Sequence, residues 1–375
     1  MDALRLIDGK MLRKGYTTGS CATAAAKAAT IMLLTQQKCP QVVITTPKRD
    51  MLTLDVWHDE FNTLYASCAI QKDSGDDPDI TNGVLVYAKV TFSAKDITLK
   101  GGEGIGLVTK PGLDQPVGNY AINNTPRRMI HEACLAICQQ HNYTGGLNIE
   151  ISIPGGAELA EHTFNPRLGI IGGLSILGTS GIVEPMSQAA IVETIRAELS
   201  LIRATGKEAI LLTVGNYSET FAENNLGLEL NSHVKCSNFI GESLAAAAEL
   251  GFKRTLLIGH IGKLVKLGIG ITNTHSNHGD GRMETIIACA LEAGASLDTL
   301  LALQACVSTD AALDCLTGSV YQTTLDLLAQ RVTATLQRHV AAHLQCSFIC
   351  FSGLGDKMKL CFQSPCLESI KEDFH

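Results

Sequence analysis

The chain has 375 residues, of which 45% are hydrophobic and 18% are charged, and its formal net charge is −7. This composition is typical of a globular protein long enough for two domains, and it excludes wholesale disorder. Because an acidic surface does not attract polyanions, nucleic acid is not an expected partner.

The cysteines and the N-terminal segment both favour a cytoplasmic location. None of the 13 cysteines belongs to a Cys-x-x-Cys pair, so we expect most of them to be buried small hydrophobes in a reducing compartment. The N-terminus shows no apolar segment typical of a secretory signal. The longest stretch without a charged residue or histidine, residues 168–183, is shorter than the roughly 20 residues of a membrane span. We expect no membrane partner, and the oligomeric state, including a homo-oligomer, is left open.

The first part of the chain is predicted to combine two helices with several strands. An alanine-rich helix runs from about Thr18 to Leu34, and a second helix starts at Thr125–Pro126, where Thr suits the N-cap and Pro the first helical position. Alternating or clustered β-branched and apolar residues predict strands at residues 42–46, 51–57, 63–71, 84–92 and 147–153. We therefore expect residues 1–160 to form an α+β domain with an antiparallel or mixed sheet.

From about residue 165 the predicted strands alternate with single helices. Strands are expected at residues 168–177, 209–214, 255–259 and 347–351, and helices between Ser187 and Gly206 and at residues 237–250, 284–293 and 323–344. Such alternation produces right-handed βαβ units and a parallel sheet. Residues 161–375 are therefore expected to form an α/β domain with a mostly parallel sheet, which would bind ligands at the carboxyl ends of its strands.

Hydroxyl groups and glycines cluster where the first helix is predicted to begin. Thr17, Thr18 and Ser20 lie in this stretch, with Lys14 and Lys27 nearby. A helix N-terminus carries unpaired N–H groups and a partial positive charge, so it suits an anionic ligand. The alternative is an ordinary N-cap on a packed helix.

A glycine-rich stretch at residues 172–181 has the spacing of a phosphate-binding loop. Thr179 stands where such a loop needs its lysine, which excludes a nucleotide triphosphatase. The turn could still let a nucleoside approach the backbone, and the alternative is a tight turn with close packing. Gly215 and Asn216 follow a later strand, where Asn could hydrogen-bond a ribose or a carboxylate. The candidate nucleoside-binding residues are Gly172, Gly173, Gly178, Thr179, Ser180, Gly181, Gly215 and Asn216.

An aspartate-rich loop, Asp73–Asp79, separates two predicted strands. Its carboxylates could supply a general base or a cation site, but the spacing of a calcium loop fails because no Glu follows at the required offset. A solvated or structural turn is the default interpretation. The spacing of His275 and His278 is a weak match to zinc ligation, and no cysteine or carboxylate completes it. We therefore expect no metal site made by the protein itself.

Seven strings of this sequence, in order between residues 14 and 282, resemble the cobalt-precorrin-5B C(1)-methyltransferase family of anaerobic cobalamin biosynthesis. Ser20 and Ser74 depart from the family pattern, where Thr and Ala are common, but both keep a small residue. The matching strings are Gly15–Cys21, Lys72–Asp79, Gly102–Lys110, Ala121–Asn123 with Pro126–Arg127, Gly178–Met186, Lys235–Phe239 and Gly259–Lys263.

The resemblance implies an enzyme that transfers a methyl group from S-adenosylmethionine to carbon 1 of cobalt-precorrin-5B, giving cobalt-precorrin-6A. This substrate is an anionic tetrapyrrole with many acetate and propionate carboxylates, and it brings the cobalt with it. Residues of the N-terminal domain are expected to hold that carboxylate rim: Lys14, Thr17, Thr18, Ser20, Lys110, Arg127 and Arg128.

The resemblance leaves the methyl-donor site and any catalytic base to the residues. We expect S-adenosylmethionine on the C-terminal domain, against residues 172–181 and Gly215–Asn216, and Asp76, Asp77 and His260 remain alternative candidates for a base. A non-catalytic carrier of a tetrapyrrole or cobalt corrinoid is the main alternative function, and it would have no need of a nucleoside site. A nicotinamide oxidoreductase is disfavoured because no Gly-x-Gly-x-x-Gly string precedes a predicted helix.

Overall fold

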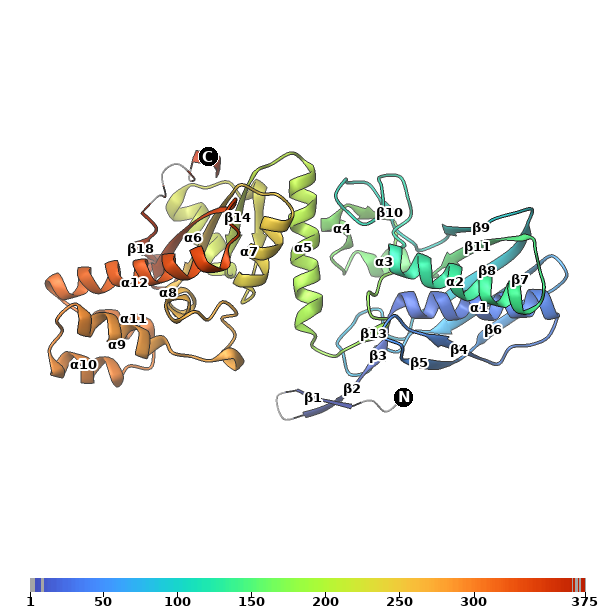
Figure 1. The fold of residues 1–375 in the computed structure, drawn as a ribbon, viewed down its shortest axis with the longest axis horizontal. Helices are drawn as coiled ribbons and strands as arrows, with labels where there is room; N and C mark the ends of the chain where they lie inside the picture. Colours follow the sequence, from blue (N-terminus) through green and yellow to red (C-terminus); the bar gives the residue numbers. More distant parts are fainter. Residues whose placement is uncertain (1–3, 8–9, 366, 368–369, 371, 375) are drawn as a thin grey trace. The chain divides into compact units, whose positions relative to one another are not determined.

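The computed structural model describes residues 4–7, 10–365, 367, 370 and 372–374 (Figure 1). The chain divides into a first unit, Met1–Gln188, and a second unit, Ala189–His375. The first unit thus extends past the domain boundary expected at residue 160. No helix in the described part of the chain combines the length and the apolar character that a membrane crossing requires.

The first unit is built around α1 (Thr18–Thr35), the helix predicted from its alanines. Most side chains of α1 are buried, and the small alanines let the helix lie close to the sheet and to α2 (Asn124–Gln140). A helix that is apolar on all sides belongs in a core, since no face of it suits water. The N-cap is Thr17, and the helix ends at Gln36 in the left-handed conformation.

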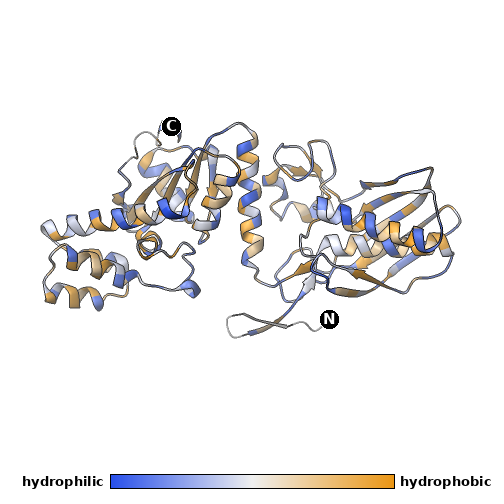
Figure 2. Cartoon of the chain, in the orientation of Figure 1, coloured by the Kyte–Doolittle hydropathy of each residue, from blue (hydrophilic) through white to orange (hydrophobic). Residues whose placement is uncertain are grey.

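A five-stranded sheet packs against α1. Its strand order is β6-β7-β8-β11-β9, and neighbouring strands are antiparallel except β11 and β9, which are parallel. In Figure 2 parts of these strands carry the orange of hydrophobic residues, which fits the burial of many of their side chains in the core around α1. The mixed sheet expected from the sequence is confirmed. The strands and short helices of this unit are β1 (Leu4–Ile7), β2 (Lys10–Arg13), β3 (Gly15–Tyr16), β4 (Gln41–Thr45), β5 (Met51–Asp55), β6 (Trp57–Phe61), β7 (Tyr65–Gln71), β8 (Leu85–Ser93), β9 (Ile97–Gly101), β10 (Leu107–Val108), β11 (Gly146–Ser152), α3 (Gly156–Ala160), α4 (Asn165–Leu168), β12 (Ile170–Ile171) and β13 (Ile182–Val183).

Residues 161–188 complete the first unit instead of opening the second. β12 pairs with β10 and β13 pairs with β3, so this segment adds its strands to the N-terminal half. The strand predicted at residues 168–177 is therefore wrong as a member of the parallel sheet. Its apolar side chains, including Leu174 and Ile176, are buried in the core of the first unit, which explains the misleading pattern.

The second unit contains the expected parallel sheet. The strand order is β15-β14-β16-β17-β18; the first four strands are parallel and β18 is antiparallel to β17. Separate apolar clusters include alternate residues of these strands, as expected for a sheet covered on both faces. The elements are α5 (Gln188–Ala204), β14 (Ala209–Thr213), α6 (Asn216–Leu226), η1 (Leu230–Ser232), β15 (His233–Lys235), α7 (Ile240–Glu249), β16 (Arg254–His260), α8 (Ile261–Leu264), η2 (Val265–Ile269), η3 (Ser276–His278), α9 (Arg282–Glu292), α10 (Leu297–Gln304), α11 (Thr309–Asp314), α12 (Gly318–His339), β17 (Gln345–Ser352), η4 (Gly355–Lys357), β18 (Lys359–Gln363) and η5 (Glu372–Phe374).

The cysteines fit the expectation of small buried hydrophobes. All twelve that the structure describes are free thiols, and eight of them are buried. Burial raises the pKa of several of these thiols, among them Cys21 and Cys236, each to about 12. These thiols are therefore protonated at neutral pH and unsuited to nucleophilic chemistry.

Candidate functional site

The hydroxyl groups at the start of α1 are used by the fold. Thr17 Oγ1 accepts a hydrogen bond from the Ser20 N–H at 3.2 Å, as an N-cap does. Thr18 Oγ1 donates to the Ser175 carbonyl at 3.2 Å, and Ser20 Oγ donates to the Gly181 carbonyl at 2.7 Å. All three side chains are buried. The capping alternative therefore describes this helix start, and these hydroxyls already have protein partners.

Three amides of the same turn are also paired inside the protein. The Gly19 N–H donates to a carbonyl of the loop that follows β12, that of Leu177, at 3.0 Å. The Cys21 N–H donates to the Thr17 carbonyl at 3.1 Å. With Ser20 capped as well, an anion at this point would have to displace protein acceptors. Three of the first four N–H groups of α1 thus have protein acceptors, which leaves few donors for the carboxylate expected at this helix start.

Three of the four glycines of residues 172–181, all except Gly172, are explained by close packing. A Cβ on Gly173 would lie 2.4 Å from backbone atoms of Gly104, and one on Gly178 would lie 2.3 Å from Thr17 Oγ1. Gly178 also has a φ of 135°, a conformation that favours glycine. This loop belongs to the first unit, whereas Gly215 and Asn216 belong to the second. The nucleoside-binding residues expected from the sequence are thus divided between the two units.

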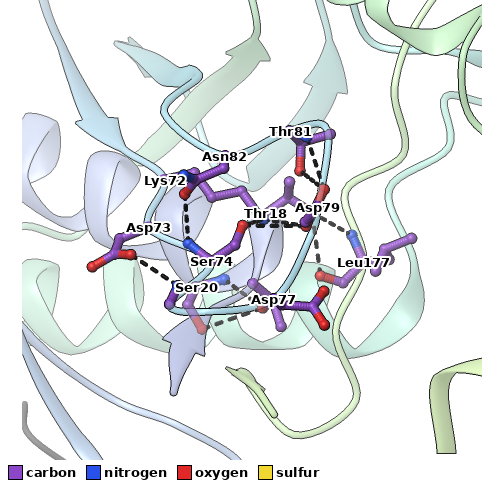
Figure 3. A network of polar contacts seen from close by, with 12 residues as sticks. Thr18, Ser20, Lys72, Asp73, Ser74, Asp77, Asp79, Thr81, Asn82 and Leu177 are labelled. Carbon is purple, nitrogen blue, oxygen red and sulfur yellow. Dashed lines mark hydrogen bonds and ion pairs between the residues drawn. The ribbon is translucent and has the colours of Figure 1, made fainter. Parts of the chain in front are cut away.

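The aspartate-rich loop is an ordered structure, shown in Figure 3. Lys72 is only 3% exposed, and its ammonium donates to Ser74 Oγ and to Asp79 Oδ2. Burial opposes ionisation of Asp79, but the hydrogen bonds from Lys72 and Thr81 prevail and lower the pKa of this carboxyl. Of the two default interpretations, the structural turn describes this loop and the solvated turn does not. The buried Lys72 holds the loop in place through its contacts with Ser74 and Asp79.

The two candidate bases of this loop form hydrogen bonds with other segments of the same unit. Asp76 Oδ2 accepts a hydrogen bond from the Arg13 N–H at 2.6 Å, and Asp77 Oδ1 accepts one from the Met186 N–H at 2.9 Å. Asp73 binds the guanidinium of Arg13 through both oxygens, and this hydrogen bonding is the main reason why the pKa of Asp73 is lowered. Asp76 remains exposed to solvent, whereas Asp77 is half-buried.

A cavity of about 360 Å³ lies beside this loop. We call this cavity the tryptophan hollow. Sequence reasoning missed it, although one signal was present: the chain has a single tryptophan, and it begins a segment, Trp57–Phe61, without an alternating apolar pattern. In the structure Trp57 is 47% exposed. The lining residues are Tyr16, Asp55, Trp57, Gln71, Lys72, Asp73, Asn82 and Gly83.

A second cavity of the first unit, of about 310 Å³, brings together two of the cations expected to bind carboxylates. Arg127 and Arg128 lie in the first turn of α2, and Arg127 Nε donates to the Ile122 carbonyl at 2.7 Å, which orients its guanidinium. Apolar side chains of β9, α2 and β11 complete the wall. The lining residues of this arginine hollow are Ile97, Leu99, Arg127, Arg128, Ile130, His131 and Ile149.

The other two expected cations lie elsewhere in the first unit. Lys14 Nζ is 3.9 Å from Glu184 Oε1, and Lys110 Nζ donates weakly to the Arg167 carbonyl at 3.4 Å. Lys110 is exposed and Lys14 is half-buried. Neither residue lines the arginine hollow.

The second unit places His260 and Asn216 at the carboxyl ends of the adjacent strands β16 and β14. The chain leaves β14 towards β15 and reaches β17 after β16, on the opposite side, which makes this point a topological switch. His260 Nδ1 accepts a hydrogen bond from the Gly262 N–H at 3.1 Å, and its Nε2 lies 3.4 Å from Asp310. Burial lowers the pKa of His260, against the opposing charge of Asp310. Asn216 Oδ1 accepts from Lys235 Nζ at 2.7 Å.

The first histidine of the segment after η2, His275, has a structural role. His275 Nδ1 accepts a hydrogen bond from the Asn277 N–H at 3.2 Å and so caps η3. Within the residues that the structure describes, no group of three or more metal-ligating side chains is assembled.

Comparisons with known proteins place these features in a family. A family described as CbiD matches residues 6–185, and a second family model, described as CbiD, C-terminal domain, matches residues 273–358. The chain is 46% identical over 310 residues to cobalt-precorrin-5B C(1)-methyltransferase of Ruminiclostridium cellulolyticum, covering 83% of this chain and 81% of that protein. It is 44% identical over 349 residues to the protein of the same name from Photorhabdus laumondii, covering 92% of each.

A solved structure is also similar in sequence. The crystal structure of a cobalamin biosynthesis protein (cbiD) from Archaeoglobus fulgidus is 27% identical and matches 69% of this chain and 80% of its own, with a TM-score of 0.40.

Proposed function

This chain belongs to the CbiD family, and we infer from that membership that it is a methyltransferase of cobalamin biosynthesis that methylates carbon 1 of cobalt-precorrin-5B. The observation that carries the inference is the 44% identity to a relative of that name over 92% of both chains. A non-catalytic carrier finds no support among the relatives. The proposal places the reaction in the cytoplasm, where free thiols such as those of this chain persist.

The methyl donor in this proposal is S-adenosylmethionine. An electron-rich ring carbon of the tetrapyrrole attacks the methyl carbon, the bond from methyl to sulfur breaks, and its electron pair leaves with the neutral thioether. Such a displacement needs the donor and acceptor atoms in line, and positioning alone can supply about 7 kcal/mol or more of the barrier. It needs no covalent intermediate with the enzyme.

The arginine hollow is the best candidate for part of the substrate site. Arg127 and Arg128 can each bind a carboxylate through two N–H groups, and the apolar wall beside them suits the face of a macrocycle. Lys14 and Lys110 do not line the hollow, and the proposal includes them only as positive charges outside it. Thr17, Thr18 and Ser20 enter it only through the helix that they hold in place.

A catalytic base is still to be chosen among Asp76, Asp77 and His260. Each is tested by replacing its acid or base group and measuring the rate of methyl transfer as a function of pH. A variant that keeps the full rate and the same profile is eliminated.

The function is tested with isotopically labelled S-adenosylmethionine and cobalt-precorrin-5B. We expect the label to appear as a new methyl group on carbon 1 of the product, detected by NMR, together with one equivalent of S-adenosylhomocysteine. Binding of the tetrapyrrole without binding of S-adenosylmethionine, and without transfer of label, would establish the carrier instead. Arg128→Gln should raise the KM for the tetrapyrrole, with Lys95→Gln, an exposed lysine of the same unit that does not line the hollow, as the control.

A further inference from the structure

We infer that the tryptophan hollow of the first unit binds the methyl donor, S-adenosylmethionine, with its aromatic and carboxylate side chains facing the positively charged part of that molecule. The inference rests on the proposed function, because it assigns a site to the second reactant. It departs from the location expected from the sequence, since three of the four glycines of residues 172–181 are occupied in packing.

The hollow is a formed cavity with walls from several segments. Its volume of about 360 Å³ lies within the range of roughly 300 to 1,000 Å³ that small-molecule sites occupy. The backbone N–H of Tyr16, in β3, donates to the Asp73 carbonyl at 2.8 Å, and its phenol donates to the Gln71 carbonyl at 2.9 Å. These bonds fix one wall to another, so a ligand would find the walls already in place.

Trp57 gives the hollow a large aromatic surface that the fold itself does not bury. It is the chain's only tryptophan and is 47% exposed, at the first position of β6. An exposed indole beside a cavity offers a face on which a purine can stack, and its π-electrons attract a cation. S-adenosylmethionine carries both groups, an adenine ring and a sulfonium.

Asp55 supplies negative charge at the same place. It is exposed, and its Oδ1 accepts a hydrogen bond from the Gln41 amide at 2.7 Å. Because that donor is uncharged, the contact does not cancel the charge of the carboxylate. Burial is the main cause that raises the pKa of Tyr16, and the charges of Asp73 and Asp55 raise it further, as expected beside carboxylates.

The cations near the hollow are already paired. Arg13 binds the carboxylate of Asp73, and the ammonium of Lys72 is directed at Ser74 and Asp79 (Figure 3). A carboxylate-rich ligand would therefore find acidic side chains here and no uncommitted partner in either cation. The hollow suits a positively charged nucleoside better than an anionic tetrapyrrole.

The two cavities of the first unit thus have opposite chemistry. The arginine hollow offers Arg127 and Arg128 on an apolar wall, and the tryptophan hollow offers Trp57 and Asp55. The two reactants of the proposed function also differ in this way, one being a polyanion and the other a sulfonium cation. Assigning each reactant to the cavity of complementary charge uses both hollows.

The single tryptophan makes the test direct, because all indole fluorescence of the protein comes from the proposed site. The full chain is titrated with S-adenosylmethionine and with S-adenosylhomocysteine, and Trp57 emission is recorded alongside calorimetric affinity. We expect emission to change and saturate at the same ligand concentration as the heat. Protection of Trp57 from quenching by acrylamide should follow the same curve.

Two variants separate stacking from charge. Trp57→Ala should weaken binding of both ligands, by about tenfold for the loss of one stacked base. Asp55→Asn should weaken binding of S-adenosylmethionine more than binding of S-adenosylhomocysteine, because only the former carries the sulfonium charge. Asp96→Asn, an exposed carboxylate of the same unit outside the hollow, is the matched control and should change neither affinity.

Asn216→Ala decides between this site and the one expected at the switch point of the second unit. If Asn216→Ala abolishes donor binding while Trp57→Ala and Asp55→Asn leave it unchanged, and Trp57 emission does not respond, the inference is overturned and the proposed function stands. If the unmodified protein neither binds S-adenosylmethionine nor transfers its methyl group, the proposed function itself is wrong.

Discussion

At Gly178 the fold leaves no room for a Cβ atom. A Cβ at this position would lie 2.3 Å from Thr17 Oγ1, and the backbone has a φ of 135°. Gly178→Ala should therefore lower the free energy of unfolding by about 2 to 4 kcal/mol, from steric conflict and backbone strain together. Urea unfolding measures the loss.

Gly172 offers a matched control in the same loop. Its φ of 78° also favours glycine, but a Cβ there would meet nothing within 4 Å. Gly172→Ala should cost only about 1 kcal/mol, the strain alone. Equal losses for the two variants would contradict the packing explanation of Gly178.

His260 should make the stability of the second unit depend on pH. Burial lowers its pKa from the ordinary value of 6.5, so the unfolded chain takes up the proton first as the pH falls. Stability is therefore lost on the acid side of that value, because the unfolded state binds more protons there. His260→Asn keeps an acceptor for the Gly262 N–H but does not titrate.

The measurement is urea unfolding of both proteins at about pH 8 and about pH 5. The unmodified protein should lose more stability between these values than His260→Asn does. An identical loss in both proteins would show that His260 is not protonated at a lower pH in the folded state.

At the scale of residues, local sequence predicted a helix start but not the contacts made there. Thr17, Thr18 and Ser20 stand at a helix start as predicted, but their bonds to residues far along the chain, such as Gly181, cannot be read from local sequence. Trp57 was overlooked because exposure depends on the whole fold. The placement of Arg127 and Arg128 in one hollow follows from their being adjacent on one helix turn.

The loop between β7 and β8 depends on one buried ion pair. Lys72 is buried, and Asp79, its partner, is half-buried. Lys72→Met should lower the free energy of unfolding by about 2 to 3 kcal/mol, because it leaves a partly buried carboxylate without its cation. Lys100→Met, which removes an exposed pair with Glu150, is the control and should leave stability unchanged within error. A similar loss in the two variants would refute a special role of burial at Lys72.

At the scale of elements, period and composition predicted α1, α2 and the parallel strands well. The alanine run of α1 has no strand-like pattern, and β14 and β16 are continuous apolar runs between helices. The strand predicted at residues 168–177 was wrong as part of the parallel sheet: its short strand β12 pairs with β10, and the segment is apolar through burial in the first unit, not through membership of the parallel sheet. A short apolar run cannot by itself distinguish these two causes.

The two units should unfold as separate cooperative bodies, because their large cores are made of different residues. Leu257→Ala, in the core of the second unit, should destabilise that unit by about 2 to 5 kcal/mol. Far-ultraviolet circular dichroism should record the earlier transition. The emission of Trp57, which lies in the first unit, should keep its midpoint; a parallel shift of both signals would mean that the units unfold together.

At the scale of the whole molecule, the sequence correctly indicated a mixed α+β half followed by an α/β half. The boundary could not be located from local patterns, because the pairing of β13 with β3 joins residues far apart in the sequence. Gln188, the last residue of the first unit, is also the first residue of α5. No change in amino-acid composition marks this boundary.

The large sheet of the first unit contains a late strand between two earlier ones, and this orders its assembly during synthesis. β11 lies between β8 and β9, both of which precede it in the chain. While the ribosome adds about 5 to 20 residues per second, one side of β8 waits without its neighbour until residue 152 has left the exit tunnel. For those seconds the nascent chain exposes an unpaired strand edge. We therefore expect a chaperone that binds such edges to associate with the nascent chain.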